Sequence, residues 1–310
     1  MGNKALLMAV VVTVFISTAY ARALDTAPPV DPATLPAVME SDAALPDFTV
    51  YHPRDLAGAS KIPILAWAEG GCANVGNAYA EFLAEIASHG YLVVAVGPIV
   101  PDYRAPLMPR PTDSTPPAKL QPAGAAPTVP PGATPRKLIQ AIDWAVGEND
   151  REGSKYFHRL DSSKIAVMGH SCGGVQAGWA VLHDPRIRTI IFGNSGLFPE
   201  PRFGMDVSSA DLAQVKVPVA YFLGGVTDVA YPPAEENLQH YKGVPVFMGS
   251  VNVGHGGTYH DPQGGEFARA TIAWLDWQLK GDAKAARLFE GTQCGLCKDS
   301  QWSIQRRASD

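Results

Sequence analysis

The sequence predicts an α/β fold built on a doubly wound, mostly parallel sheet, and two features of its patterning carry this prediction. Short apolar runs recur with no polar residue alternating inside them, as in Leu92–Val96. Such strands are typical of a parallel sheet that helices cover on both faces. Segments with helical periodicity separate the runs, for example Tyr79, Phe82, Leu83 and Ile86 at i, i+3, i+4 and i+7. Alternation of the two patterns along the chain indicates a doubly wound sheet.

The expected elements follow one another through one domain, residues 47–310, a length that suits a single large α/β domain. We expect strands at 62–67, 92–96, 165–168, 189–192, 217–223 and 244–253. We expect helices around 79–86, 139–144, 175–182, 234–241 and 266–280. The second of these helices should begin at Thr134-Pro135, because a capping residue followed by proline suits a first helical turn.

Two segments fall outside this alternation. Residues 24–46 are rich in Pro, Ala and Asp and should form an extended leader. Residues 98–135 hold twelve prolines and little apolar patterning, so we expect a long extended excursion there. Because loops after strand ends build the sites of such folds, this excursion should border a cleft. Trp67, Tyr103 and Tyr231 are candidates to line the cleft, although each could equally be ordinary packing.

The first 23 residues have the pattern of an export signal. Lys4 supplies a positive charge, residues 5–16 form an apolar run too short to span a bilayer comfortably, and Ala19-Tyr20-Ala21 has small residues where a signal peptidase reads them. Cleavage is expected after Ala21 or Ala23, and the alternative is an uncleaved N-terminal anchor. We therefore expect a secreted or periplasmic protein with no stable membrane anchor after cleavage.

Charge and cysteine content narrow the partners. The formal net charge of −5 and pI near 5.9 provide no basic field to hold nucleic acid or an anionic membrane.

All four cysteines lie beyond residue 23, an even number in an oxidising compartment. Cys294 and Cys297 should form a small local disulfide, because a redox-active CxxC needs a preceding strand and a following helix. No further Cys or His flanks this pair, so we expect no zinc site there. Nothing else in the sequence implies a metal or an organic cofactor.

The stretch Gly169-His170-Ser171-Cys172-Gly173 matches the G-x-S-x-G pattern of an activated serine. The pattern is informative only where an apolar strand enters it and a helix leaves it, and both conditions hold here. The glycines allow a sharp turn, so Ser171 should stand clear of the sheet at the start of a helix. A similar stretch, Gly193-Asn194-Ser195-Gly196, lacks the outgoing helix.

A serine hydroxyl needs a base within hydrogen-bond reach and a carboxylate that orients the base. In this architecture the acid and then the histidine follow the serine, each on a loop beyond a strand. Asp228 follows the strand at 217–223 and His255 follows the strand at 244–253. We therefore predict Ser171, His255 and Asp228 as nucleophile, base and orienting acid.

Other assignments of the acid and the base remain open. Asp228 could merely cap the helix that follows it, with Asp206 as the acid. His260 lies in the same loop as His255 and could replace it. His170 should be structural, because adjacency along a turn points its side chain away from the nucleophile.

The oxyanion formed by such a nucleophile needs two preorganised N–H donors. One should be the N–H of Cys172, and the other should come from the loop Glu69-Gly70-Gly71-Cys72-Ala73. Taken together, this loop, Ser88-His89-Gly90, the Ser171 motif and the turns at Asp228 and His255 resemble the α/β-hydrolase superfamily. Within it the chain is most similar to secreted dienelactone-hydrolase-like esterases and to bacterial cutinases and polyester hydrolases, over about residues 48–280.

The resemblance implies a sheet of the α/β-hydrolase type and places the loop donor at Cys72. It implies a serine hydrolase that cleaves small-molecule or polymeric carboxylic esters through an acyl-enzyme. The chain departs from its relatives in three ways: serine replaces the cysteine nucleophile of dienelactone hydrolases, Cys72 replaces a frequent aromatic residue, and the 98–135 excursion is longer. The alternatives are an amidase or peptidase that uses the same triad, and a non-catalytic binding protein on the hydrolase fold.

A second disulfide follows from these assignments as a hypothesis. If Cys72 and Cys172 donate to one oxygen atom, their backbones lie within the Cα range that a disulfide tolerates. A Cys72–Cys172 bridge would then hold both donors in place. The alternative is a pair of free thiols that line the acyl pocket.

Overall fold

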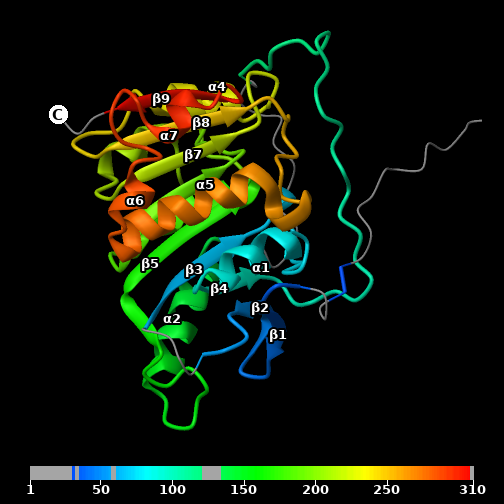
Figure 1. Ribbon diagram of the computed structural model, residues 1–310, viewed down its shortest axis with the longest axis vertical. Coiled ribbons are helices and arrows are strands. Elements are labelled where there is room, and N and C mark those ends of the chain that lie inside the picture. Colours follow the sequence, from blue (N-terminus) through cyan, green and yellow to red (C-terminus); the bar gives the residue numbers. More distant parts are fainter. Residues whose placement is uncertain (1–29, 32–34, 57–60, 121–133, 308–310) are drawn as a thin grey trace, which may run out of the picture.

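The computed structural model describes residues 30–31, 35–56, 61–120 and 134–307. These residues contain a nine-stranded sheet in the order β1-β2-β4-β3-β5-β6-β7-β8-β9 (Figure 1). The strands from β4 to β8 in this order are mutually parallel, and β1, β2 and β9 pair antiparallel at the two edges. The prediction of an α/β fold with a mostly parallel sheet is confirmed.

The strands are β1 (Val38–Asp42), β2 (Leu45–His52), β3 (Ile62–Ala68), β4 (Leu92–Val96), β5 (Leu160–His170), β6 (Ile187–Gly193), β7 (Val219–Leu223), β8 (Val246–Val251) and β9 (Trp302–Arg307). The α-helices are α1 (Ala80–Ser88), α2 (Arg136–Asp150), α3 (Cys172–His183), α4 (Tyr231–Asn237), α5 (Gly265–Leu275), α6 (Ala283–Ala286) and α7 (Gly295–Lys298). None of the helices among the described residues is long and apolar enough to cross a membrane.

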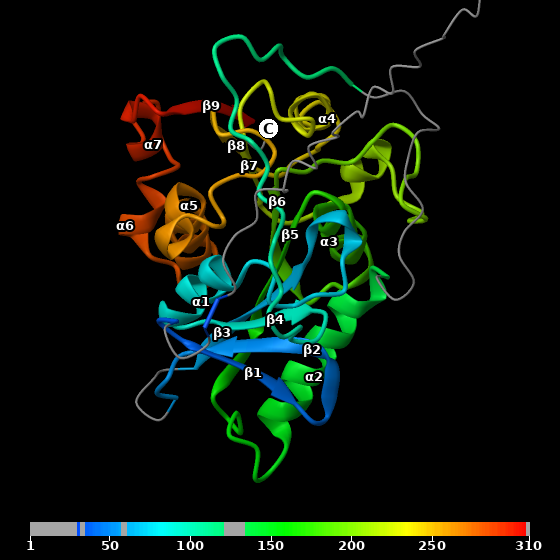
Figure 2. The ribbon, with the colours of Figure 1, turned by 90° about the vertical axis from the view of Figure 1, so that its right-hand side faces the viewer.

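Helices cover both faces of the sheet, which explains why its central strands are apolar throughout. α2 and α3 pack on one face, where Leu138 and Val175 belong to one buried cluster. α1 and α5 pack on the other face, where Phe82 and Trp274 belong to a second cluster. Figure 2 shows the sheet between these two layers. Every residue of β3, β4 and β7 is buried, as expected for strands covered on both sides.

Both edges of the sheet contain strands that the patterning did not predict. The prediction of an extended leader over residues 24–46 is wrong for residues 38–46, which form β1 and the start of β2. β9 at the opposite edge was also not predicted. Short antiparallel edge strands with one solvated face give a weak signal in sequence, unlike the apolar central strands. The rest of the expected leader outside 30–31 and 35–37, the expected export signal, and residues 121–133 of the excursion lie outside the described residues.

Two helices differ from their expected bounds. The helix expected at 234–241 begins at Tyr231 and ends at Asn237, because Pro232 and Pro233 suit its first turn. The helix expected at 266–280 is α5 continued by a π-helical turn, Asp276–Lys280, which stops at Gly281 in the left-handed conformation (φ 71°).

The order of the strands creates a topological switch point at one end of the sheet. The chain passes from β3 outward to β4 and then returns to β5 on the other side of β3. The connections after β3 and β5 therefore leave in opposite directions, and α1 and α3 cover opposite faces. Binding sites of open α/β sheets lie at such a switch point, beyond the carboxyl ends of the strands.

Candidate active site

Ser171 lies at this switch point, on a sharp turn between β5 and α3. Its backbone angles, φ 52° and ψ −118°, are unusual for a residue with a side chain. Conformations of this kind cost about 1–3 kcal/mol and persist where the surrounding structure enforces them. The Ser171 N–H donates to the Gly193 carbonyl at 2.9 Å, and the Ser195 hydroxyl donates to the Ser171 carbonyl at 2.6 Å. The turn is thereby fixed to the end of β6.

The glycines of the motif are required by close packing around this turn. A Cβ atom on Gly169 would lie 2.2 Å from the carbonyl carbon of Gly173, and one on Gly173 would lie 2.0 Å from the Ala68 oxygen. Both contacts are with backbone atoms that cannot move aside. The sharp turn and the approach of α3 to the end of β3 therefore require glycine at both positions.

The structure brings the three predicted residues into one hydrogen-bonded chain. His255 Nε2 lies 2.9 Å from Ser171 Oγ, and His255 Nδ1 lies 2.6 Å from Asp228 Oδ1. Asp228 is fully buried, whereas the His255 side chain is 18% exposed. Since a carboxylate only accepts, His255 Nδ1 carries a proton and its Nε2 can accept the proton of Ser171.

Four donors surround the Asp228 carboxylate. Besides His255, the N–H groups of Gly224 and Ala230 donate at 2.9 Å each, and Asn194 Nδ2 donates at 2.7 Å. Burial acts to raise the pKa of Asp228, but the hydrogen bonds from His255 and from these backbone groups lower it below its ordinary value. The aspartate is therefore held as an anion beside the imidazole.

The alternative acid and base do not join this chain. Asp206 is exposed on the surface. His260 stacks on Tyr79, with ring centroids 5.1 Å apart and an interplanar angle of 22°, and burial lowers its pKa. Asp228 does accept from the Ala230 N–H, but Ala230 is itself the N-cap residue of α4 and no side chain caps that helix, so the structure does not support the capping interpretation.

Cys72 and Cys172 lie on the two sides of the switch point. Their Cα atoms are 5.2 Å apart and the two residues form a disulfide pair, as hypothesised. Cys72 closes a short 3-10 turn, Gly70–Cys72, and α3 begins at Cys172. Neither N–H group has a backbone acceptor among the described residues.

Cys294 and Cys297 form the second disulfide pair, with Cα atoms 4.9 Å apart. The pair spans α7, and no cysteine of the described chain is free. The prediction of a local disulfide at this site is confirmed. No group of three or more His, Cys, Asp or Glu side chains within the described ranges could hold a metal ion.

Asn194 belongs to the site although the sequence interpretation dismissed its segment. Its amide donates to Asp228 and, at 3.1 Å, to the Gly254 carbonyl, and its oxygen accepts from the Tyr259 hydroxyl at 3.0 Å. Its position directly after β6 was a usable signal, because the ends of β5, β6 and β7 meet at the same edge of the sheet. A buried polar residue there is placed to contact Asp228, which follows β7.

His170 is buried, as expected of a structural residue, but it is not remote from the site. Its Nε2 lies 2.9 Å from the His255 carbonyl oxygen, and its Nδ1 lies 2.8 Å from the Tyr79 hydroxyl. Its side chain points to the loop of the base rather than away from the site.

A comparison of the sequence with protein-family models gives no match. A comparison with curated proteins gives no significant relative either. The geometry of the site is therefore the basis on which a function can be proposed.

The described part of the excursion lies across the loop that bears His255. Residues 106–110 line a cavity of about 320 Å³ together with Tyr79, His170, Gly256 and His260. The Arg110 guanidinium donates to both carboxylate oxygens of Asp261, at 2.7 and 2.8 Å. This segment thus borders the site.

The aromatic candidates for lining the cleft have different roles. Trp67 is fully buried and packs against Tyr79 and Phe82, so of the two alternatives left open it is ordinary packing. Its position inside an all-buried strand explains this. The Tyr231 hydroxyl accepts from Gln305 of β9. Tyr103 is half-buried in the excursion.

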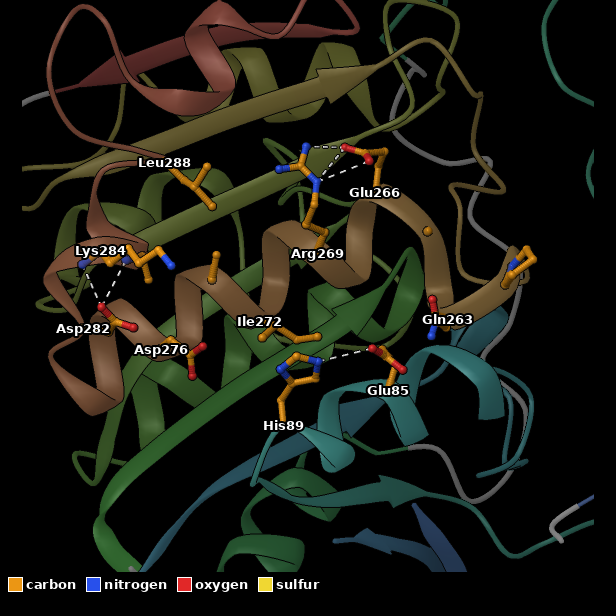
Figure 3. A pocket seen from close by; sticks show the side chains of 14 residues that line it. Glu85, His89, Gln263, Glu266, Arg269, Ile272, Asp276, Asp282, Lys284 and Leu288 are labelled. Carbon is orange, nitrogen blue, oxygen red and sulfur yellow. Dashed lines mark hydrogen bonds and ion pairs between the residues drawn. The ribbon is translucent and has the colours of Figure 1, made fainter. Parts of the chain in front are cut away.

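A larger cavity of about 690 Å³ lies between α1, α5 and α6 and includes none of the three residues of the chain (Figure 3). Two ion pairs lie among its lining residues, Glu85 with His89 and Glu266 with Arg269. We assign no function to this cavity.

Proposed function

We propose that this protein is a serine hydrolase of the α/β-hydrolase type that cleaves carboxylic esters through an acyl-enzyme. The observation that carries the proposal is the chain from Ser171 Oγ through His255 to Asp228, with separations of 2.9 and 2.6 Å. The strained turn at Ser171 and the position of the site at the switch point support it.

The first half of the proposed reaction forms the acyl-enzyme. Ser171 Oγ attacks the carbonyl carbon of the ester while His255 Nε2 takes its proton, and Asp228 stabilises the imidazolium through Nδ1. The negative charge that develops on the carbonyl oxygen accepts hydrogen bonds from the N–H groups of Cys72 and Cys172. The intermediate then collapses, the C–O bond of the alcohol breaks, and His255 gives its proton to the departing oxygen.

The second half releases the acid. A water molecule gives a proton to His255 and attacks the acyl carbon, and a second tetrahedral intermediate forms in the same oxyanion site. Its collapse breaks the bond to Ser171 Oγ, which regains the proton from His255. The transfer between Ser171 and His255 uses groups already 2.9 Å apart, and the two steps need no further reactant besides water.

We also propose that the protein acts outside the cytoplasm. The export pattern of residues 1–23 supports this. The two disulfide pairs are in keeping with an oxidising compartment.

The proposal is tested by Ser171→Ala with a short-chain nitrophenyl ester as substrate. The expected loss of kcat is about 10⁶-fold, because the variant retains binding and oxyanion donors but has no nucleophile. Ser250→Ala, which removes a buried hydroxyl from β8, should retain full activity. A fluorophosphonate should label the wild-type protein at Ser171 alone. Unchanged hydrolysis by the Ser171 variant, or no labelling of the wild type, would contradict the proposal. A parallel assay with the amide analogue of the same substrate distinguishes an esterase from an amidase.

A further inference from the structure

His170 is a buried histidine whose two ring nitrogens both have defined partners. The ring is 1% exposed. Its Nε2 contacts the main-chain oxygen of His255, and its Nδ1 contacts the Tyr79 hydroxyl. His170, which directly precedes Ser171, therefore connects the end of β5 with Tyr79 and with the loop that carries His255.

The partners determine where the proton of His170 lies. A carbonyl oxygen can only accept, so Nε2 carries the hydrogen and donates to His255. Nδ1 is then the acceptor of the Tyr79 O–H. Burial lowers the pKa of His170 to about 3, so the ring stays neutral in this tautomer over the ordinary pH range.

Dense packing holds this ring in place. A Cβ atom on Gly70 would lie 2.3 Å from His170 Nδ1, so the ring approaches the backbone as closely as glycine permits. The Tyr79 ring is itself packed between Tyr259, at a centroid distance of 5.2 Å, and the stacked His260. Neither the His170 ring nor the Tyr79 ring can rotate without displacing the residues packed against it.

The segment that carries His255 is, in contrast, intrinsically flexible. Gly254 precedes the histidine, Gly256 and Gly257 follow it, and Gly254 and Gly257 have positive φ angles of 74° and 59°. Glycine gives the backbone many alternative conformations. A fixed donor to the His255 carbonyl removes that freedom at the residue whose ring must face Ser171.

We propose that His170 is a positioning residue that fixes the main chain of His255 and so directs its imidazole at Ser171. The proposal rests on the proposed function, since it assigns His255 as the base. His170 does not touch the reacting atoms in this scheme. It acts through the orientation of His255.

The test compares His170→Leu, which removes the donor, with His170→Gln, whose amide can still donate. For His170→Leu we expect kcat to fall about 10- to 100-fold, the effect of a small misorientation of a catalytic group. KM should stay within about twofold, because the substitution acts through the orientation of His255. His170→Gln should recover kcat to within about threefold of the wild type.

His52→Leu is the matched control. His52 is a buried histidine in β2 whose Nδ1 donates to the Pro53 carbonyl at 2.7 Å, so the substitution makes the same chemical change outside the site. It should lower thermal stability and leave kcat unchanged. Equal losses of kcat in the leucine variants of His52 and His170, or no recovery with His170→Gln, would overturn the proposal.

A second measurement does not depend on ester hydrolysis. Long-range ¹⁵N–¹H correlation spectra of the full-length protein should show His170 protonated at Nε2 alone from pH 5 to 8. A proton on Nδ1, or a doubly protonated ring, would overturn the proposed positioning role of His170 even if the protein is an esterase. If the spectra agree but neither ester hydrolysis nor labelling of Ser171 is found, the proposed function fails while the contact to His255 stands.

Discussion

Two buried carboxyl groups near Ser171, those of Asp228 and Glu69, differ in their hydrogen bonding and in the direction of their pKa shifts. Asp228 accepts four hydrogen bonds and is held as an anion. Glu69, which precedes the Gly70–Cys72 turn, is equally buried, and its two oxygens have no hydrogen-bond partner among the described residues. Burial raises the pKa of Glu69 well above its ordinary value, although the polar side chain of Trp67 acts to lower that pKa. Burial therefore favours the neutral form of Glu69 in the folded protein.

This difference makes the stability of the protein depend on pH with a definite sign. Above the ordinary pKa of a glutamate the unfolded chain loses the Glu69 proton, whereas the folded protein keeps it. The stability from this group is therefore full at low pH and decreases as the pH rises towards the folded pKa, by about 1.4 kcal/mol per pH unit. Glu69→Gln removes this loss, so the stability of the variant relative to wild type should increase from pH 4.5 to pH 8 in urea unfolding.

Glu148→Gln is the control with the opposite sign. The hydrogen bond from Arg151 is the main cause that lowers the pKa of Glu148, so its stabilisation is present above the ordinary pKa and is lost as the pH falls. The deficit of Glu148→Gln should therefore shrink towards low pH. A Glu69→Gln difference that is constant across the pH range would contradict the interpretation of Glu69.

At the level of residues, the sequence predicted Ser171, Asp228 and His255, which follow strand ends. It did not predict that His170 and Asn194 form hydrogen bonds to the residues of this chain. Ser171, Asp228 and His255 were found because strand, turn and chain order restrict their places. The contact of His170 with the His255 carbonyl depends on the path of the loop across the sheet edge, which no local pattern encodes. Asn194 is neither a nucleophile nor a base, so the serine pattern of its segment did not point to it.

At the level of elements, the apolar strands of the sheet centre were predictable and its edges were not. β3, β4 and β7 are buried on both faces, so composition alone identifies them. In β9, by comparison, only Trp302 is buried, and the polar residues after it resemble a loop in sequence. Its partner β8 is remote in sequence, so the pairing that makes it a strand is invisible locally.

The excursion is an element without regular structure that is nevertheless attached to the site. Beyond the Arg110–Asp261 pair, the Ala118 N–H donates to the Val226 carbonyl at 2.8 Å, in the loop that carries Asp228. A Cβ atom on Gly256 would lie 3.1 Å from Met108 Cβ, which shows how closely the segment covers the His255 loop. Its composition predicted an extended path, but only the fold determines what that path contacts.

Arg110→Ala should therefore loosen this segment without unfolding the protein. The Arg110 side chain is 53% exposed, so the lost ion pair should cost no more than about 1 kcal/mol of global stability. Hydrogen exchange of the Ala118 amide should nevertheless become faster, because the nearby anchor of the segment is gone. Lys164→Ala, which removes a comparable surface pair with Asp161, should leave that amide unchanged. Unaltered exchange in the Arg110 variant would show that packing alone holds the segment.

At the level of the whole molecule, the two disulfides differ in what they join. Cys294–Cys297 closes a loop with a sequence separation of 3, within one short helix. Cys72–Cys172 has a sequence separation of 100 and connects the ends of β3 and β5 across the switch point, so the loop it closes contains α1, β4, the excursion and α2. A link of this kind restricts the unfolded chain far more than a local one.

Removing each bridge should therefore have unequal effects on global stability. In the chain-entropy model, the long loop contributes about 4.7 kcal/mol and the short loop about 2 kcal/mol. We expect the free energy of unfolding in urea to fall more for the double variant Cys72→Ala/Cys172→Ala than for Cys294→Ala/Cys297→Ala, by roughly 3 kcal/mol. Each double variant replaces two cysteines by alanine, so the second is a control for the loss of sulfur packing. Equal losses would mean that the long bridge does not constrain the unfolded chain, and that its role is confined to holding the N–H groups of Cys72 and Cys172 together beside Ser171.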